Sequence, residues 1–350
     1  MNLRKKLVCL TATMAIASTG MATGLTAYAS ADSLTGAGST LVAPLMARWA
    51  ADFQSKTGNT VTYGSVGSGS GISQISSRTV NFGASDAPLT PQQAGACDTC
   101  VQIPWALSAV AVAFNVPGVT HLQLTGKVVA LIYQGAITNW NDARIKKLNK
   151  GVSLPNLQIT PAFRSDGSGT TYAFTDYLSR VSKSFRSNIG FATAVSFPVG
   201  TGGKGNDGVT AVVNSTSGAI GYIGADYAVA HGISVASVQN RAGKFLFPNL
   251  KNIEDAALLV KKVPKSNELH IVNPPVGNKH NKKLAKKAYP ISTFTYVIVP
   301  KVSPKKDLLA QFILYAMTQG QVFGPALDFP PIPKIVLDKA KKDVQKFKTS

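Results

Sequence analysis

The sequence contains few of the side chains that bind metals or act as catalytic nucleophiles and bases. Its 350 residues include three cysteines and four histidines, and the histidines are scattered at His121, His231, His270 and His280. There is no HExxH zinc motif, no complete P-loop and no G-x-S-x-G serine elbow. We therefore expect no metal, no cofactor and no enzymatic reaction, and an enzyme remains the main alternative from another functional class.

Acidic residues are also scarce, with 16 Asp and Glu against 36 Lys and Arg, which gives a formal charge of +20. Much of the excess lies in lysine doublets of the last third, such as Lys282-Lys283 and Lys286-Lys287. No aromatic side chains or known nucleic-acid motif accompany them, so we expect no nucleic-acid partner. Two explanations stay open: a positive field that gathers anions, or adaptation to acidic surroundings.

Long apolar runs are missing except at the N-terminus. Arg4, Lys5 and Lys6 precede the largely apolar stretch 7–25, and small residues follow up to Ala31, as in a secretory signal peptide. We expect residues 1–31 to be removed after Ala29 or Ala31, leaving a soluble periplasmic protein with a charge of +17. Cys9 lies inside the apolar run, so no lipid anchor is expected.

The mature chain keeps only Cys97 and Cys100, separated by two residues. Two thiols cannot complete a tetrahedral zinc site by themselves. A redox-active pair normally opens a helix after a buried strand, and the flanking residues do not have that pattern. A small loop disulfide in an oxidising compartment is the preferred interpretation.

Strand-like runs alternate with helical patterns, which predicts an α/β fold. Leu41, Leu45, Trp49 and Phe53 recur every fourth residue, and Gly58 ends that helix. Runs 61–63 and 159–163 read as strands. About 320 mature residues normally form two lobes.

Three Gly/Ser/Thr segments each open a predicted helix: 35–40, 67–71 and 167–170. A helix start carries unpaired backbone N–H groups and partial positive charge, so it binds anions. One such segment is typical of an ordinary helix cap, but three in one chain favour a tetrahedral oxyanion.

Charged residues beside these segments narrow the ligand. Arg164 can grip two oxygens of an oxyanion, and Asp166 can hold its guanidinium in place. Asp86 follows a strand and can accept a hydrogen bond from a protonated ligand. Phosphate near neutral pH keeps such a proton, whereas sulfate has none and would leave Asp86 as an unpaired buried charge.

Several stretches, in this order, closely resemble the phosphate-binding proteins of bacterial high-affinity phosphate importers, and the likeness spans roughly residues 33–335. They are LTGAGST (34–40), VGSG (66–69), FGASDAPL (82–89), RSDGSGT (164–170), GGKGNDG (202–208), SGAIGY (217–222) and YPIS (289–292).

The resemblance implies a two-lobed periplasmic-binding-protein fold of type 2, with the ligand cleft between lobes joined by two hinge crossings near Asn115 and 288–291. Lobe I would comprise 32–115 and 289–350, and lobe II 116–288. It also implies phosphate contacts from Thr40, Leu41, Ser68, Asp86, Arg164, Ser168, Gly169 and Thr170, with Asp166 orienting Arg164.

The implied partners are phosphate and the membrane permease and ATPase subunits of an ABC importer, with the binding protein a monomer. Leu41 departs from the Phe common in the family, which its backbone N–H contact should tolerate. The lysine-rich last third also departs from the family pattern. A binder of sulfate or molybdate, and an added signalling or adhesion role, remain alternatives.

Overall fold

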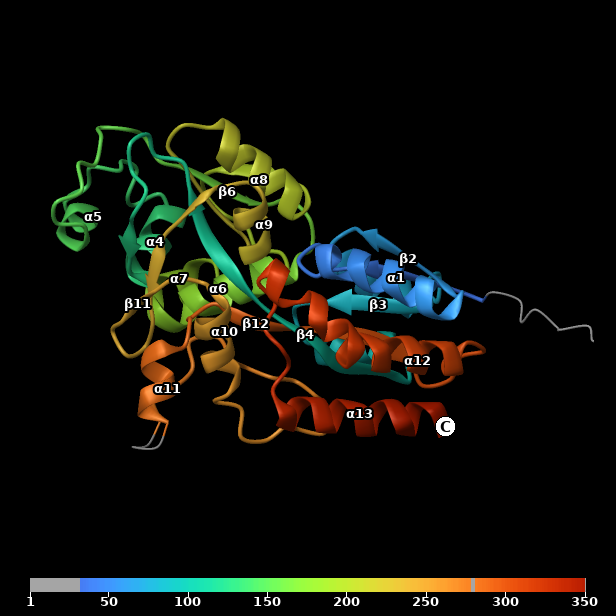
Figure 1. The fold of residues 1–350 in the computed structure, drawn as a ribbon. Coiled ribbons are helices and arrows are strands. Elements are labelled where there is room, and N and C mark those ends of the chain that lie inside the picture. The colour runs from blue at the N-terminus through green and yellow to red at the C-terminus, as the bar shows by residue number, and fades with distance from the viewer. Residues whose placement is uncertain (1–31, 278–280, 350) are drawn as a thin grey trace, which may run out of the picture. The chain divides into compact units, whose positions relative to one another are not determined.

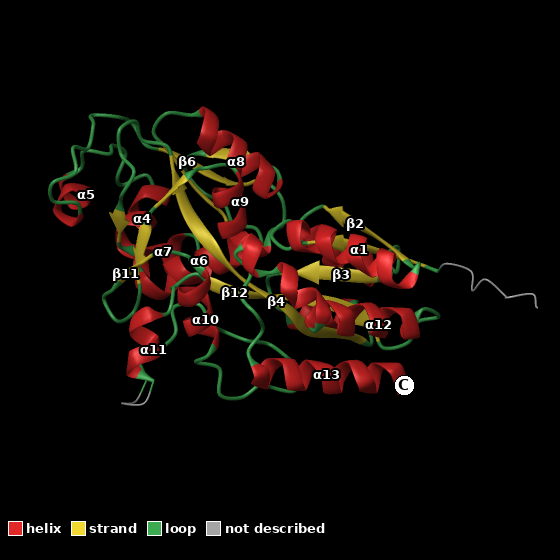
Figure 2. Cartoon of the chain, viewed as in Figure 1, coloured by secondary structure: helices red, strands yellow, loops and turns green. Residues whose placement is uncertain are grey.

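The computed structural model describes residues 32–277 and 281–349 as a mixed α/β structure (Figures 1 and 2). The predicted signal peptide, 1–31, lies outside the described residues. Among the described residues, no helix is long and apolar enough to cross a membrane.

Within residues 32–277 and 281–349, twelve strands form two sheets. They are β1 (Ser33–Gly38), β2 (Thr60–Ser65), β3 (Phe82–Ser85), β4 (Cys100–Phe114), β5 (Gln123–Leu124), β6 (Thr160–Arg164), β7 (Thr201–Gly203), β8 (Ala219–Gly224), β9 (Ser234–Val235), β10 (Ser237–Gln239), β11 (Phe245–Leu246) and β12 (Ser292–Pro300). The large sheet has the order β2-β1-β3-β12-β4-β8-β6-β7, with β9 also paired to β4, and the small sheet has the order β11-β10-β5.

The helices are α1 (Ala43–Thr57), α2 (Ser68–Ser76), α3 (Pro91–Ala96), α4 (Gly126–Tyr133), α5 (Ala143–Leu148), α6 (Gly169–Val181), α7 (Lys183–Asn188), α8 (Gly205–Ser215), α9 (Ala225–Ala230), α10 (Leu250–Ala257), α11 (Lys282–Lys287), α12 (Lys306–Met317) and α13 (Lys334–Thr349), with 3-10 turns η1 (Gln319–Phe323) and η2 (Pro325–Leu327). The predicted first helix is confirmed: Leu45, Trp49 and Phe53 are buried along α1, and Gly58 ends it with a left-handed φ of 74°. Part of the polar stretch 278–287 forms α11.

The long strand β4 belongs to both halves of the large sheet. Residues 100–109 pair with β12, and residues 110–114 pair with β8. Beside this change of partner the chain returns toward β12: the Val110 N–H donates to the Ile291 carbonyl at 2.8 Å, and the Tyr289 hydroxyl donates to the Val110 carbonyl at 2.9 Å. The two segments at which hinge crossings are predicted therefore lie side by side near Val110. The expected crossing at Asn115 is five residues past Val110, and the lobe limits remain predictions.

Buried aromatic side chains contact one another in both halves of the large sheet. Trp49, Phe82, Trp105 and Phe312 contact one another on the side of β3 and β12. Tyr133, Phe174 and Tyr222 do so beside β8. Both groups belong to one continuous hydrophobic core of buried residues, which extends along β4.

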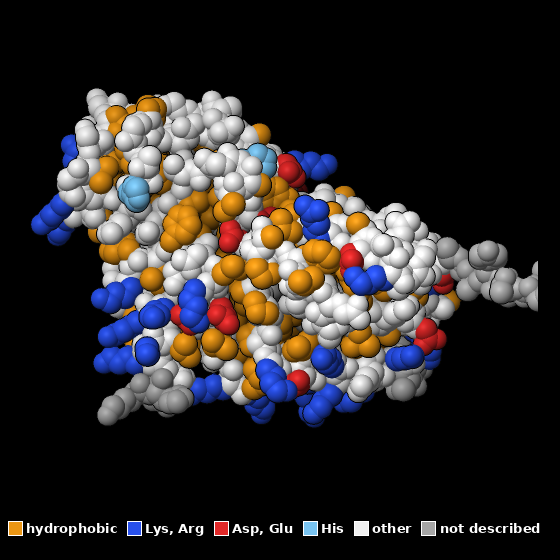
Figure 3. All heavy atoms as spheres, in the orientation of Figure 1, with side chains coloured by type: hydrophobic (Ala, Val, Ile, Leu, Met, Phe, Trp, Pro, Cys, Tyr) orange, Lys and Arg blue, Asp and Glu red, His pale blue; other side chains and the backbone are white. Residues whose placement is uncertain are grey.

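Positive charge is concentrated late in the chain. Residues 241–350 hold 20 of the Lys and Arg residues against seven acidic ones. Figure 3 shows many of these blue side chains around the positions that α11 and α13 occupy in Figure 1. The four lysines of α11 are all exposed.

A disulfide links Cys97, at the end of α3, to Cys100, at the start of β4. The closed loop is short, and the two residues between the cysteines, Asp98 and Thr99, both have positive φ. The Arg78 side chain donates to the Cys97 and Asp98 carbonyls at 2.8 Å each, which also holds this turn.

Reduction of the disulfide is expected to lower the free energy of unfolding by no more than about 3 kcal/mol, because so short a loop constrains the unfolded chain little. Phosphate affinity should be unchanged, since no predicted ligand residue contacts the cysteines. Denaturant unfolding and phosphate titration of native and Cys97→Ser/Cys100→Ser proteins measure both. A loss of affinity in a folded double variant would contradict this.

Candidate functional site

The three predicted anion-binding segments meet in the structure. The Ser39–Val42 turn links β1 to α1, Gly67 precedes α2, and 165–168 link β6 to α6. Contacts join segments far apart in sequence: Gly69 N–H to the Gly167 carbonyl at 2.9 Å, and Gly169 N–H to Ser68 Oγ at 3.0 Å. The segments that follow these strands therefore bring the starts of α1, α2 and α6 close together.

Two glycines allow this close approach. Gly67 has a φ of 89°, and a Cβ there would lie 2.2 Å from Asp166 Oδ2. A Cβ on Gly169 would lie 2.6 Å from the Asp86 backbone nitrogen. Any side chain at either position would push the segments apart.

The predicted ligand residues are deeply buried. Thr40, Ser68, Asp86, Ser168 and Thr170 are each no more than 2% exposed. The Arg164 side chain is 1% exposed, and Leu41 and Gly169 are also buried. All eight predicted ligand residues are therefore shielded from solvent.

The hydroxyl oxygens of Ser68 and Thr40 each accept two hydrogen bonds from N–H groups. Ser68 Oγ accepts from Gly169 N–H and from Asp86 N–H, at 3.0 and 3.3 Å. Thr40 Oγ1 accepts from the backbone N–H and the side-chain amide of Asn206, at 3.2 and 2.8 Å. A hydroxyl has one proton and two lone pairs, so each can offer only its proton to a further group.

Asp86 supplies the carboxylate at this point. Its Oδ1 accepts from the Ser39 and Thr295 hydroxyls at 2.6 and 2.9 Å. Burial raises the pKa of Asp86, and the hydroxyls of Ser39, Thr295 and Ser68 together with the positive charge of Arg164 oppose that rise. The site therefore holds a buried acceptor among many donors.

Arg164 is fixed by Asp166 through two parallel hydrogen bonds. Nε donates to Oδ1 at 2.7 Å and Nη2 to Oδ2 at 2.5 Å, while Gly205 N–H donates to Oδ1 at 3.0 Å. Burial opposes ionisation of Asp166, but the hydrogen bond and charge of Arg164 outweigh it and lower the pKa of Asp166. Nη1 donates to Thr170 Oγ1 at 3.4 Å, and its second proton can be offered to a further group.

Sequence reasoning missed three residues that organise this arrangement. Ser39 and Thr295 hold Asp86. Asn206 joins Thr40 to Thr170 and accepts from Gly224 N–H. Asn206 lies inside the GGKGNDG stretch, which marked its neighbourhood but not its role. Thr295 is 209 residues from Asp86, and no local pattern pointed to it.

Leu41 and Ser168 were expected to contact the ligand. The Leu41 N–H instead donates to Ser39 Oγ at 3.1 Å. Ser168 caps α6, where its Oγ accepts from Thr171 N–H at 3.1 Å, and its own proton stays available. The ligand contacts of both residues remain predictions.

Asp226, in the first turn of α9, is a second buried carboxylate near the site. It is 5% exposed, and its Oδ1 has no hydrogen-bond partner among the described residues. Burial raises the pKa of Asp226 well above 3.8, and the charges of Asp328 and Asp86 raise it further. Its ionised form is therefore unfavourable in the folded protein.

Asp226→Asn is expected to stabilise the protein at neutral pH. A carboxyl whose pKa is raised by folding stabilises the fold below pH 3.8, and that contribution is lost as pH rises through the higher folded pKa. Asparagine is neutral throughout, so the gain over wild type should be absent in acid and grow toward neutrality. We expect the melting temperature at pH 7 to rise by at least about 2 °C.

Melting curves between pH 3 and pH 8 measure this effect. Asp207→Asn is the matched control, because Asp207 also lies in the first turn of a helix, α8, but is exposed. An equal gain in the control, or a gain for Asp226→Asn that does not vary with pH, would contradict the burial argument.

The chain is similar to known phosphate-binding proteins. The sequence profile of the PBP superfamily domain matches residues 23–319. The phosphate-binding protein PstS of Pasteurella multocida is 35% identical over 88% of this chain and 89% of its own length. The PstS of Haemophilus influenzae is 36% identical over 91% and 94%.

Solved structures share the fold. A DING protein aligns with a TM-score of 0.70 at 20% identity, over 88% of this chain and 93% of its own. A putative phosphate ABC transporter substrate-binding protein from Clostridium perfringens, with bound phosphate, aligns with a TM-score of 0.62 at 21% identity, over 86% of this chain and its whole length. These likenesses fit the two-lobed α/β architecture.

Proposed function

The chain belongs to the PBP superfamily and, within it, to the PstS phosphate-binding proteins, and from this premise we propose how it holds its ligand. It binds inorganic phosphate for an ABC-type phosphate importer. In our proposal the contacts come from the residues that the sequence predicted: Thr40, Leu41, Ser68, Asp86, Arg164, Ser168, Gly169 and Thr170.

The observation that carries the proposal is the balance of donors and acceptors at one buried point. Ser68 and Thr40 have only protons left to offer, because N–H groups occupy their oxygens. Arg164 adds a buried guanidinium whose orientation is set by Asp166. A tetrahedral oxyanion is the ligand that satisfies such a set of donors without leaving buried polar groups unpaired.

Asp86 gives the site its preference among oxyanions. Monohydrogen phosphate can donate a hydrogen bond to the Asp86 carboxylate. Sulfate has no proton, so its negative charge would be repelled by the carboxylate. Because Asp86 is buried and repulsion inside a dry site is strong, sulfate should be rejected. The hydroxyls of Ser39 and Thr295 hold the carboxylate in the position from which it selects phosphate over sulfate.

Asn206 holds the two sides of the site together in this proposal. Its amide bonds Thr40, which follows β1, and approaches Thr170 at the start of α6. These residues lie on opposite sides of β4 in the strand order. We propose that this bridge holds the two sides of the site together around bound phosphate and shields the ligand from water.

The delivery step is proposed from the family. We propose that the exported protein acts in the periplasm as a monomer, catalyses no reaction, and presents phosphate to permease and ATPase subunits. Equilibrium dialysis of radiolabelled phosphate tests the binding step, with one phosphate per chain expected. Release of phosphate from a phosphate ester by the pure protein would instead favour the enzyme alternative.

A further inference from the structure

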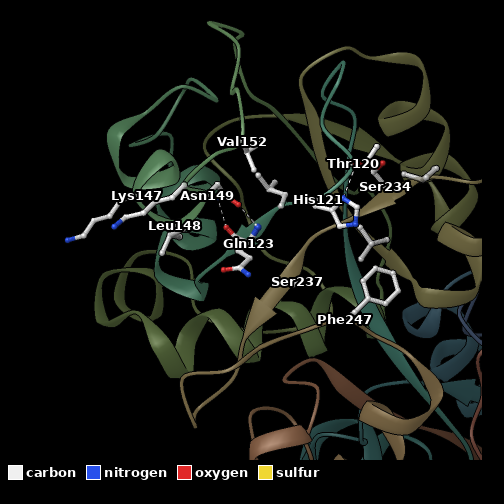
Figure 4. A pocket seen from close by; sticks show the side chains of 14 residues that line it. Thr120, His121, Gln123, Lys147, Leu148, Asn149, Val152, Ser234, Ser237 and Phe247 are labelled. Atoms are coloured by element: carbon white, nitrogen blue, oxygen red, sulfur yellow. Dashed lines mark hydrogen bonds between the residues drawn. The ribbon is translucent and has the colours of Figure 1, made fainter.

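Among the pockets of the described chain, two in the predicted lobe II lie away from the proposed phosphate site and have polar or charged linings. The larger, about 660 Å³, contains Thr120, His121 and Asn149 (Figure 4). Asn149 bonds both backbone groups of Gln123, Thr120 bonds His121, and no lining residue has a buried side-chain polar atom without a partner among the described residues. Lys147 points away from the other labelled residues in Figure 4. Nothing in this pocket requires a ligand.

The second pocket, about 480 Å³, is strongly basic. Four separate segments bring Lys127, Arg180, Arg186 and Arg241 to its lining, and no acidic residue lines it. Arg180 pairs with Asp176 at 2.8 Å. The other three cations form no ion pair with any carboxylate of the described chain. Like charges gathered around one hollow repel each other unless an anion lies between them.

An unpaired buried amide borders the same pocket. Asn273 is 5% exposed, and its Oδ1 has no hydrogen-bond partner within 32–277 and 281–349. A buried acceptor without a donor costs free energy, but an amide oxygen by itself does not bond a phosphoryl oxygen, which is also an acceptor. Turning the amide over places Nδ2 in this buried position, from which it can donate to a phosphoryl oxygen.

The pocket walls are held in place. The Asn273 N–H donates to the Pro290 carbonyl at 2.7 Å, and the Asn240 amide donates to the Ala285 and Ala288 carbonyls at 3.0 and 3.1 Å. Tyr177, also in the lining, donates to the Gln239 carbonyl at 2.6 Å. These contacts tie the pocket to the second crossing and make it largely preformed, as small-molecule sites are.

From these observations we propose that this pocket is a second anion site, distinct from the phosphate site, for a small molecule with two or more phosphoryl groups. Three unpaired cations exceed what one orthophosphate neutralises. The volume lies within the range of about 300–1,000 Å³ typical of small-molecule pockets. Arginine forks favour phosphoryl oxygens. Inorganic oligophosphate and an organic bisphosphate share this chemistry.

The test is calorimetry on mature protein kept saturated with orthophosphate in metal-free buffer. Sodium tripolyphosphate and fructose 1,6-bisphosphate are titrated separately. We expect one-to-one binding of at least one probe, and the probe that binds identifies the inorganic or the organic source. Binding of neither probe, or displacement of orthophosphate by the probe that binds, would overturn the proposal.

Variants locate the site. Arg186→Gln and Arg241→Gln should each lower probe affinity about tenfold, and Asn273→Asp should abolish binding by adding a negative charge. Lys147→Gln and Lys150→Gln, in the pocket of Figure 4, remove the same charge elsewhere and should change affinity little. Equal losses in these controls would show diffuse attraction and overturn the proposal. The arginines are exposed, so their variants give a result even if Asn273→Asp does not fold.

Discussion

Arg164→Ala is expected to weaken phosphate binding more than any single Ser or Thr substitution in the site. The side chain is 1% exposed and paired with Asp166, so its removal deletes a charge-assisted contact and leaves a carboxylate unpaired beside an anion. Truncating one partner of a buried charge pair costs about 2–5 kcal/mol, which is a loss of roughly 30-fold or more in affinity. A neutral hydrogen bond contributes only about 1 kcal/mol.

Arg144 offers a matched control for this prediction. It makes the same two-pronged contact to a carboxylate two residues away, Asp142, but its side chain is 48% exposed. Arg144→Ala should leave phosphate affinity unchanged. A titration series in which Ser168→Ala or Thr40→Ala costs more than Arg164→Ala would remove Arg164 from its proposed central role.

Asp86→Asn is expected to reduce discrimination between phosphate and sulfate. The amide can donate as well as accept, so sulfate no longer meets an unpaired negative charge, while phosphate loses a charged acceptor. A site built for a specific hydrogen bond rejects the wrong ligand by several kcal/mol. We expect the ratio of the two affinities to fall at least about a hundredfold, since each 1.4 kcal/mol is tenfold.

The same argument predicts a pH dependence in the wild-type protein. Burial raises the pKa of Asp86, so the carboxyl gains a proton at a higher pH than an exposed aspartate would. Once protonated it resembles the amide, and sulfate rejection should decline as pH falls. Asp142→Asn is a carboxylate-to-amide change away from the site. Its ratio of phosphate to sulfate affinity should equal that of the wild-type protein at every pH. Selectivity independent of pH would contradict the role of Asp86.

The parts of the site that the sequence predicted are those with local causes. A helix start preceded by glycine and hydroxyl residues binds anions through its own backbone, so segments such as 167–170 could be recognised singly. The ion pair of Arg164 and Asp166 is also local, because the two residues are two positions apart. Burial of these residues follows from their positions at the ends of buried strands.

The remaining features depend on tertiary contacts. Thr295 reaches Asp86 only because β12 pairs between β3 and β4. Asn206 bonds Thr40 across 166 residues. The change of partner within β4 falls between Ala109 and Val110, in an apolar run without any glycine or proline, so no sequence signal marked it. Asn115, which follows the end of the strand, was the nearest residue at which the sequence suggested a lobe boundary.

Calorimetric titration of the phosphate-stripped wild-type protein at neutral pH, with phosphate and then with sulfate, tests the central claim most directly. The donor set of Ser68, Thr40 and Arg164 with the single acceptor Asp86 predicts tight one-to-one binding of phosphate and little or no heat from sulfate at the same concentrations. Equal affinity for the two anions, or no binding of phosphate by the folded protein, would contradict the account.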